Sequence, residues 1–106
     1  MEKIIFKEEI LIYFDELIYI LFLEEYFGYV KNAQQYVDKI VNFIINDISS
    51  FPSKKAPSKL QYLGSNYIFY KSNTRTTWYI FFEKRATNFL ITGIINNHCE
   101  EAKEFK

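Results

Sequence analysis

The strongest constraint on the fold comes from two apolar runs near the end of the chain, Thr77 to Phe82 and Phe89 to Ile95. β-Branched and aromatic residues dominate both runs, and this composition is typical of β-strands. The polar segment 83–88 between them predicts a turn. We therefore expect a hairpin so apolar that other parts of the chain must cover it, with a polar strand end left free at residues 96–98.

Two segments earlier in the chain have helical spacing and are the expected cover. The first should span about residues 7–26, with acidic residues in its first turn that suit the helix dipole. Its apolar stripe consists of Ile10, Phe14, Leu17 and Leu21. Ile12, Tyr19 and Leu23 fall on the opposite, charged side, where they either contact another protein or are ordinary surface residues.

The second helix is predicted to open at Asn32, because Asn32 and Gln35 form a plausible capping pair. Its apolar stripe consists of Ala33, Val37, Ile40, Ile44 and Ile48. Segment 49–59 follows, and its two prolines, four serines and three lysines predict a loop. This loop either clamps a phosphate chain or is simply solvated.

The remaining elements complete an α+β fold. Ile4 to Phe6 predicts a short first strand, Asn66 to Lys71 a further strand, and residues 99–106 a short terminal helix. Aromatic residues occupy both odd and even positions of the strands, and alternate positions point to opposite faces. Both faces of the sheet should therefore be partly covered. We expect a single domain over residues 1–106, in which a short N-terminal strand and a helical hairpin precede a three-stranded antiparallel sheet packed on the helices.

Charge is divided along the chain, although the formal net charge is zero. Residues 1–50 carry four lysines and nine acids, a net charge of −5. Residues 51–98 carry seven Lys or Arg and one acid, a net charge of +6, and the last eight residues add −1. If the two parts occupy different faces, the acidic helices oppose a basic sheet side that can meet phosphates or an acidic protein.

Cysteine and hydropathy patterns limit the chemistry and the compartment. Cys99 is the only cysteine, so the chain has no internal disulfide and no zinc-binding spacing, and we expect neither a metal nor another cofactor. The start of the chain does not have the features of a signal peptide. The uncharged run from Leu17 to Leu23 is far shorter than the roughly 20 residues of a membrane span. A soluble, cytoplasmic protein without a membrane partner is expected.

Three stretches within this order of elements carry a family resemblance. They are the Leu63-Gly64 step before residues 67–69, the strand Thr77 to Phe82, and the ending Ile94-Ile95-Asn96-Asn97-His98. Together with the order strand, helix, helix, loop and three strands, they resemble the RelE/ParE superfamily of type II toxins. The resemblance implies a toxin that causes growth arrest and is neutralised by a cognate antitoxin protein.

The resemblance leaves two targets open. RelE-like members are endoribonucleases that cleave mRNA in the ribosome and inhibit translation, whereas ParE-like members bind and poison DNA gyrase without their own catalysis. Places where RelE-like nucleases carry Lys or Arg fall here on Ile68, Tyr70 and Tyr79. The lack of cations at these places favours a gyrase-binding toxin or a toxin fold without activity, which are the alternatives. On the resemblance as a whole, with its final histidine, the chain is interpreted as an mRNA interferase.

The candidate catalytic residues of the ribonuclease are His98, Arg75 and Tyr79. Metal-free cleavage by the 2′-hydroxyl needs proton transfer and positive charge at the phosphate. His98 is the only histidine, and its imidazole can serve as acid or base. Arg75 offers a fork of donors for a phosphate, while Tyr79 can donate a phenolic proton or stack a base.

Further residues are candidates for RNA binding. They are Lys54, Lys55, Lys71, Tyr70, Arg85 and Asn97. The cations among them would hold phosphates, Tyr70 would stack a base, and Asn97 would orient His98 or a phosphate. Each also has an ordinary structural interpretation, namely a solvated charge for the cations, a core aromatic for Tyr70 and a turn former for Asn97.

Overall fold

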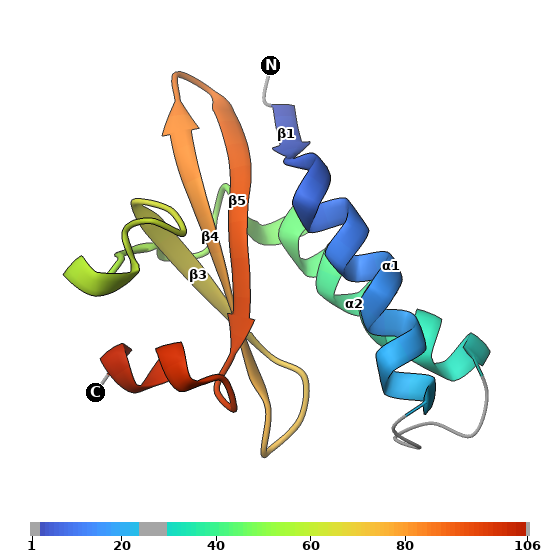
Figure 1. The fold of residues 1–106 in the computed structure, drawn as a ribbon. Helices are drawn as coiled ribbons and strands as arrows, with labels where there is room; N and C mark the ends of the chain where they lie inside the picture. The colour runs from blue at the N-terminus through green and yellow to red at the C-terminus, as the bar shows by residue number, and fades with distance from the viewer. Residues whose placement is uncertain (1–2, 24–29, 106) are drawn as a thin grey trace.

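The described residues form five strands, β1 (Lys3–Phe6), β2 (Lys54–Lys55), β3 (Asn66–Lys71), β4 (Thr77–Arg85) and β5 (Asn88–Asn96). They form one mixed sheet in the order β1-β5-β4-β3-β2. Figure 1 labels β1, β5, β4 and β3. β1 runs parallel to β5, and the other neighbouring strands are antiparallel. This computed structural model describes residues 3–23 and 30–105, without the side chains of residues 21–23, 30 and 31.

Two helices, α1 (Glu8–Leu23) and α2 (Val30–Asp47), cover one face of this sheet (Figure 1). The predicted apolar stripes are buried, namely Ile10, Phe14, Leu17, Ala33, Val37, Ile40, Ile44 and Ile48. Most of them pack with sheet residues such as Trp78 and Ile80 in a large apolar cluster, called here the helix-side cluster. The prediction for Leu21 lies outside the described side chains.

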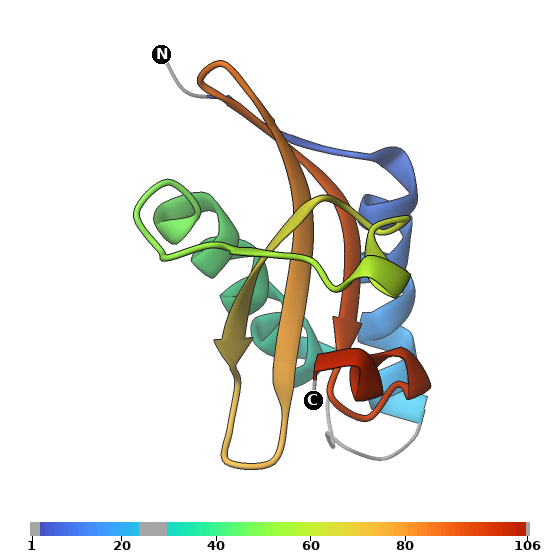
Figure 2. The same cartoon turned by 90° about the vertical axis from the view of Figure 1, so that its left-hand side faces the viewer.

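Short 3₁₀ helices, η1 (Ser58–Leu60) and η2 (Glu100–Phe105), lie in front of the other face of the sheet, with α1 and α2 behind it (Figure 2). Beneath them lies a second group of apolar residues, called here the far-face cluster: Ala56, Leu60, Leu63, Tyr67, Tyr79, Phe81, Ile95, Cys99, Ala102 and Phe105. The ring of Phe105 stacks on Tyr79 with a centroid distance of 4.0 Å and lies 4.8 Å from Tyr67. Both faces of the sheet are therefore covered, as predicted from the aromatic residues at odd and even strand positions.

A β-bulge in β5 decides which side chains face the helices. The pairing with β4 shifts after Phe81, so that Thr92 has no partner in the ladder. Ile91 before the bulge and Ile94 beyond it both pack in the helix-side cluster, although strict alternation would put them on opposite faces. Ile95 accordingly belongs to the far-face cluster.

The α+β class is confirmed, and the three predicted antiparallel strands are present as β3, β4 and β5. The predicted sheet is incomplete, because two further strands make it a five-stranded mixed sheet. β1 adds a parallel edge strand beside β5. β2 lies inside the predicted loop 49–59 and pairs with β3 at the other edge through Lys54 and Lys55. Two consecutive lysines have no strand signal, so this pairing depends on backbone hydrogen bonds that composition does not reveal.

Two predicted boundaries also shift. α2 already begins at Val30, so Asn32 lies inside the helix and the predicted capping pair does not open it. β4 continues to Arg85, because residues 83–85 still pair with β5, and the turn contracts to Ala86 and Thr87. Ala86 takes a positive φ of 54°, which the short turn requires.

The outward side of α1 presents apolar side chains to solvent. Ile12 is 48% exposed and Tyr19 is 61% exposed, as predicted for the charged side of this helix. The side chain of Leu23 lies outside the described part of the chain. Within residues 3–23 and 30–105, the chain has no helix with the length and apolar character needed to cross a bilayer.

Candidate functional site

The polar end of the sheet brings His98 and Arg75 together. The β3–β4 turn and the residues after β5 lie at the same end, because the start of β4 pairs with the end of β5 through Trp78 and Asn96. His98 Nε2 is 3.2 Å from Thr76 Oγ1. An open cavity of about 440 Å³ is lined by Asn73, Thr74, Arg75, Thr76 and His98. We refer to it as the His98 cavity.

Two asparagines fix the backbone on which this cavity is built. Asn73 Oδ1 accepts hydrogen bonds from the backbone N–H groups of Arg75 and Thr76, at 2.8 and 2.9 Å. Asn97 Nδ2 donates to the Arg75 carbonyl at 2.9 Å, and its Oδ1 accepts from the Thr77 N–H at 2.9 Å. Short polar side chains commonly stabilise turns in this way. The main chain of Arg75 is thus held in place, while the residue is exposed and lines the cavity.

His98 itself is exposed and has one hydroxyl partner. Its backbone N–H donates to Asn96 Oδ1 at 2.8 Å, which fixes the start of the turn after β5. Among the described residues, no carboxylate forms a hydrogen bond or ion pair with His98 or Arg75. The imidazole can therefore exchange protons with a bound molecule, and the guanidinium can bind an anion.

The two tyrosines predicted to act at the site lie on opposite faces of the sheet. Tyr70 belongs to the helix side and lies 5.0 Å from the ring of Phe43. Tyr79 belongs to the far-face cluster, where Phe105 covers one side of its ring. Tyr79 and Asn97 line a separate cavity of about 530 Å³ beside η2. The structure therefore does not bring Tyr79 into the His98 cavity.

The predicted cations are dispersed. Lys71 ends β3 beside Thr77, near the His98 cavity but not among the residues that line it. Lys54 and Lys55 lie on the edge strand β2. Arg85 lies at the opposite end of β4, roughly 26 Å from Thr77 at about 3.3 Å per residue. The predicted basic sheet side is therefore corrected, since these cations do not share one sheet face and the apolar far-face cluster covers the face opposite the helices.

A partly buried chain of hydrogen bonds beside the turn was not predicted. Trp78 Nε1 donates to Tyr36 Oη at 2.9 Å, and Tyr36 Oη is 2.7 Å from Ser72 Oγ. Both the N–H and the hydroxyl of Ser72 donate to the Thr76 carbonyl. α2 is thereby linked to the turn that carries Arg75. The available signal was the polar run 72–76, which indicates a turn but does not identify its partner on a helix.

Burial changes the acidity of two phenols. Burial raises the pKa of Tyr13 to about 12, and the neighbouring Cys99 and Tyr36 add to the effect. Burial also raises the pKa of Tyr67, with a smaller contribution from Tyr79. Both phenols are neutral at ordinary pH and act as packing groups or hydrogen-bond donors.

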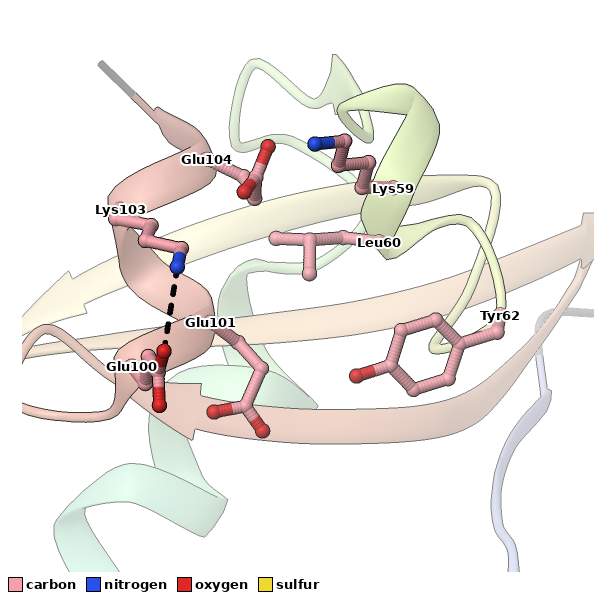
Figure 3. Close-up of a pocket in the computed structure, with 7 residues that line it drawn as sticks. All are labelled: Lys59, Leu60, Tyr62, Glu100, Glu101, Lys103 and Glu104. Atoms are coloured by element: carbon pink, nitrogen blue, oxygen red, sulfur yellow. Dashed lines mark hydrogen bonds and ion pairs between the residues drawn. The ribbon is translucent and has the colours of Figure 1, made fainter.

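A further cavity of about 370 Å³ lies between η1 and η2 (Figure 3). Lys59 of η1 and Glu104 of η2 face each other across it, and Glu101 extends toward Tyr62. Its one ion pair joins Lys103 to Glu100 within η2 at 3.2 Å. In the described part of the chain, no group of His, Cys, Asp and Glu is arranged to hold a metal ion.

Comparisons with protein families, curated proteins and solved structures found no match for this chain.

Proposed function

We propose that this chain is a RelE/ParE-like toxin that acts as an endoribonuclease through His98 and Arg75. The observation that carries the proposal is that these two residues, 23 positions apart in the sequence, line one open cavity. The order of strands and helices and the polar end of the hairpin support the same family. No metal takes part in the proposed reaction.

The proposed cleavage is an attack of the RNA 2′-hydroxyl on the adjacent phosphorus. His98 removes the hydroxyl proton while the new oxygen–phosphorus bond forms. The bond from phosphorus to the 5′ oxygen breaks, and the leaving oxygen takes a proton from water, because the cavity holds a single imidazole. Arg75 binds the phosphate oxygens as negative charge gathers on them, and Lys71 adds positive potential nearby.

The proposal is tested by inducing the chain in bacterial cells and mapping RNA 5′ ends. New ends should appear with the unaltered chain and should fall by about 10²–10⁴-fold with His98→Ala, as for loss of a general acid or base. Lys84→Ala is the control, because Lys84 lies near the opposite hairpin tip, over the ring of Phe89. Growth arrest without new RNA ends would contradict the proposed ribonuclease.

The second candidate is a ParE-like toxin that binds DNA gyrase. The dispersal of Lys54, Lys55 and Arg85 favours it, because a binding surface does not need its cations to converge on one imidazole. DNA breaks linked to gyrase should then persist in His98→Ala. If that single change abolishes toxicity while the protein stays folded, the gyrase candidate is wrong.

The proposed protein partner is an antitoxin, and the outward side of α1 supports its binding there. Ile12 and Tyr19 are exposed apolar residues beside the acids Asp15 and Glu16, so a segment with apolar and basic residues would complement this surface. A double change, Ile12→Lys with Tyr19→Glu, should reduce neutralisation by the protein encoded next to this gene. Unchanged neutralisation would place the antitoxin elsewhere.

A further inference from the structure

A polar pocket lies between α2 and β3, next to the β3–β4 turn that also lines the His98 cavity. It has a volume of about 260 Å³ and is lined by Asn32, Gln35, Tyr36, Lys39, Tyr70 and Ser72. We call it the α2 pocket. Its four helix residues recur at three- and four-residue spacing and therefore form one stripe along α2.

Three side chains of this stripe, those of Asn32, Gln35 and Lys39, are available to a ligand, whereas Tyr36 is hydrogen-bonded to Ser72 and Trp78. Within the described residues, Asn32, Gln35 and Lys39 make no side-chain hydrogen bond or ion pair. Asn32 was expected to cap the helix, but α2 begins before it, so its amide is not used there. The pocket thus presents two amides and one ammonium group beside the aromatic ring of Tyr70.

This set of groups matches the chemistry of a nucleotide. Amide side chains can both donate to and accept from the edge of a base, an aromatic ring can stack on its face, and a lysine can bind a phosphate. Pockets for drug-sized ligands have roughly 300–1,000 Å³. A pocket of about 260 Å³ suits one base better than a larger molecule.

The α2 pocket and the His98 cavity are both lined by residues of the β3–β4 turn. Ser72 lines the first and Thr76 lines the second, and the Thr76 carbonyl accepts hydrogen bonds from Ser72 at 3.1 and 3.3 Å. Tyr36 supports the turn from the helix through its contact with Ser72. An extended RNA strand that crosses this turn can therefore place one of its phosphates against Arg75 and a neighbouring base against Tyr70.

We infer that the α2 pocket is a subsite for one base of single-stranded RNA, next to the phosphate held at the His98 cavity. The inference rests on the proposed ribonuclease function and assigns to it a specificity-determining subsite. Gln35 and Asn32 read the base edge, Tyr70 stacks on the base, and Lys39 binds the flanking phosphate. Sequence preference at the cleavage point then comes from α2.

The test measures binding without requiring cleavage. The probe is a fluorescein-labelled RNA of four nucleotides with 2′-O-methyl groups, made in four versions of one base each, and binding is followed by fluorescence anisotropy. Gln35→Ala and Lys39→Ala should each weaken binding of the preferred version by about tenfold, the loss expected for one hydrogen bond or charge contact. Gln34→Ala is the matched control, because Gln34 is an exposed neighbour on α2 that does not line the pocket.

The outcomes separate this inference from the proposed function. If Gln35→Ala and Lys39→Ala bind like Gln34→Ala, or if the unaltered chain binds no version of the probe, the subsite is wrong, even when RNA ends dependent on His98 appear in cells. If the two changes weaken binding but no RNA ends appear, the subsite stands and the proposed catalysis fails.

Discussion

The two faces of the sheet are covered by different means. On the helix side, α1 and α2 bury a large cluster of mainly aliphatic residues. On the far side, η1, η2 and the segments around them cover a smaller cluster in which aromatic rings meet around Phe105. Since 3₁₀ helices have little stability of their own, the far-side cover depends on a few ring contacts. We expect the helix side to supply most of the stability and the far side to open first.

The largest effect is expected in the helix-side cluster. Ile40 is fully buried at 0% exposure, so Ile40→Ala should lower the free energy of unfolding by about 3–4 kcal/mol. Ile45→Ala is the control on the same helix, because Ile45 is 49% exposed, and its cost should be below about 1 kcal/mol. Chemical denaturation measures both. An equal loss of unfolding free energy in the two variants would mean that the helix side does not supply most of the stability.

The next effect is expected where the far-side segment approaches β4. Gly64 has a φ of 157°, and an added Cβ would lie 2.8 Å from the Phe82 nitrogen and 2.6 Å from Thr92 Oγ1. Gly64→Ala should therefore cost about 2–3 kcal/mol, from backbone strain and overpacking together. Tyr62→Ala, two residues earlier and 72% exposed, should be nearly neutral. A neutral Gly64→Ala would show that this segment can move away from the sheet.

A smaller effect is expected for the ring that holds η2. Phe105→Ala removes the stack on Tyr79 and the contact with Tyr67, and should cost about 1–2 kcal/mol because the residue is only partly buried. Hydrogen exchange should then accelerate in η2 and leave α2 unchanged. Glu104→Ala is the control within η2. Faster exchange in both regions would show that the two faces unfold as one unit.

The smallest effect is a pH dependence on the helix side. The pKa of Tyr13 is about 12 in the folded chain and 10.0 for a free phenol, chiefly because the ring is buried. Between these values the unfolded chain loses the proton first, so stability is complete below pH 10 and falls as the pH rises toward 12. Tyr13→Phe should remove about 1 kcal/mol of this decline, a value reduced for partial exposure. Urea unfolding at pH 8 and pH 11 gives the free energy of unfolding at each pH. An equal loss of this free energy in the unaltered chain and in Tyr13→Phe would contradict the prediction.

Helices and central strands were predictable because their signals are local. The stripe from Ala33 to Ile48 has a clear helical period, and all its members are buried. β2 was missed because Lys54 and Lys55 form strand only by pairing with β3. The parallel contact of β1 with β5 was also missed, since it depends on how α1 and α2 return the chain to the sheet.

The candidate site was predictable only in part. His98 and Arg75 were expected to act together, and the structure places both in one cavity. Tyr79 is held away from them by the far-face cluster, and Arg85 by the length of β4. The helix residues of the α2 pocket were missed because Gln35 and Lys39 look like any solvated helix surface until β3 is placed beside them.

The extra residue in β5 has a consequence for how relatives of this chain should be aligned. With Thr92 outside the ladder, Ile94 faces the helices and Ile95 faces away. In a homologue one residue shorter at this point, the strand residues beyond the deletion would face the opposite side of the sheet, even if every letter of the ending were identical. Strand length, more than residue identity, is therefore the property to compare before a histidine is transferred from one sequence to another.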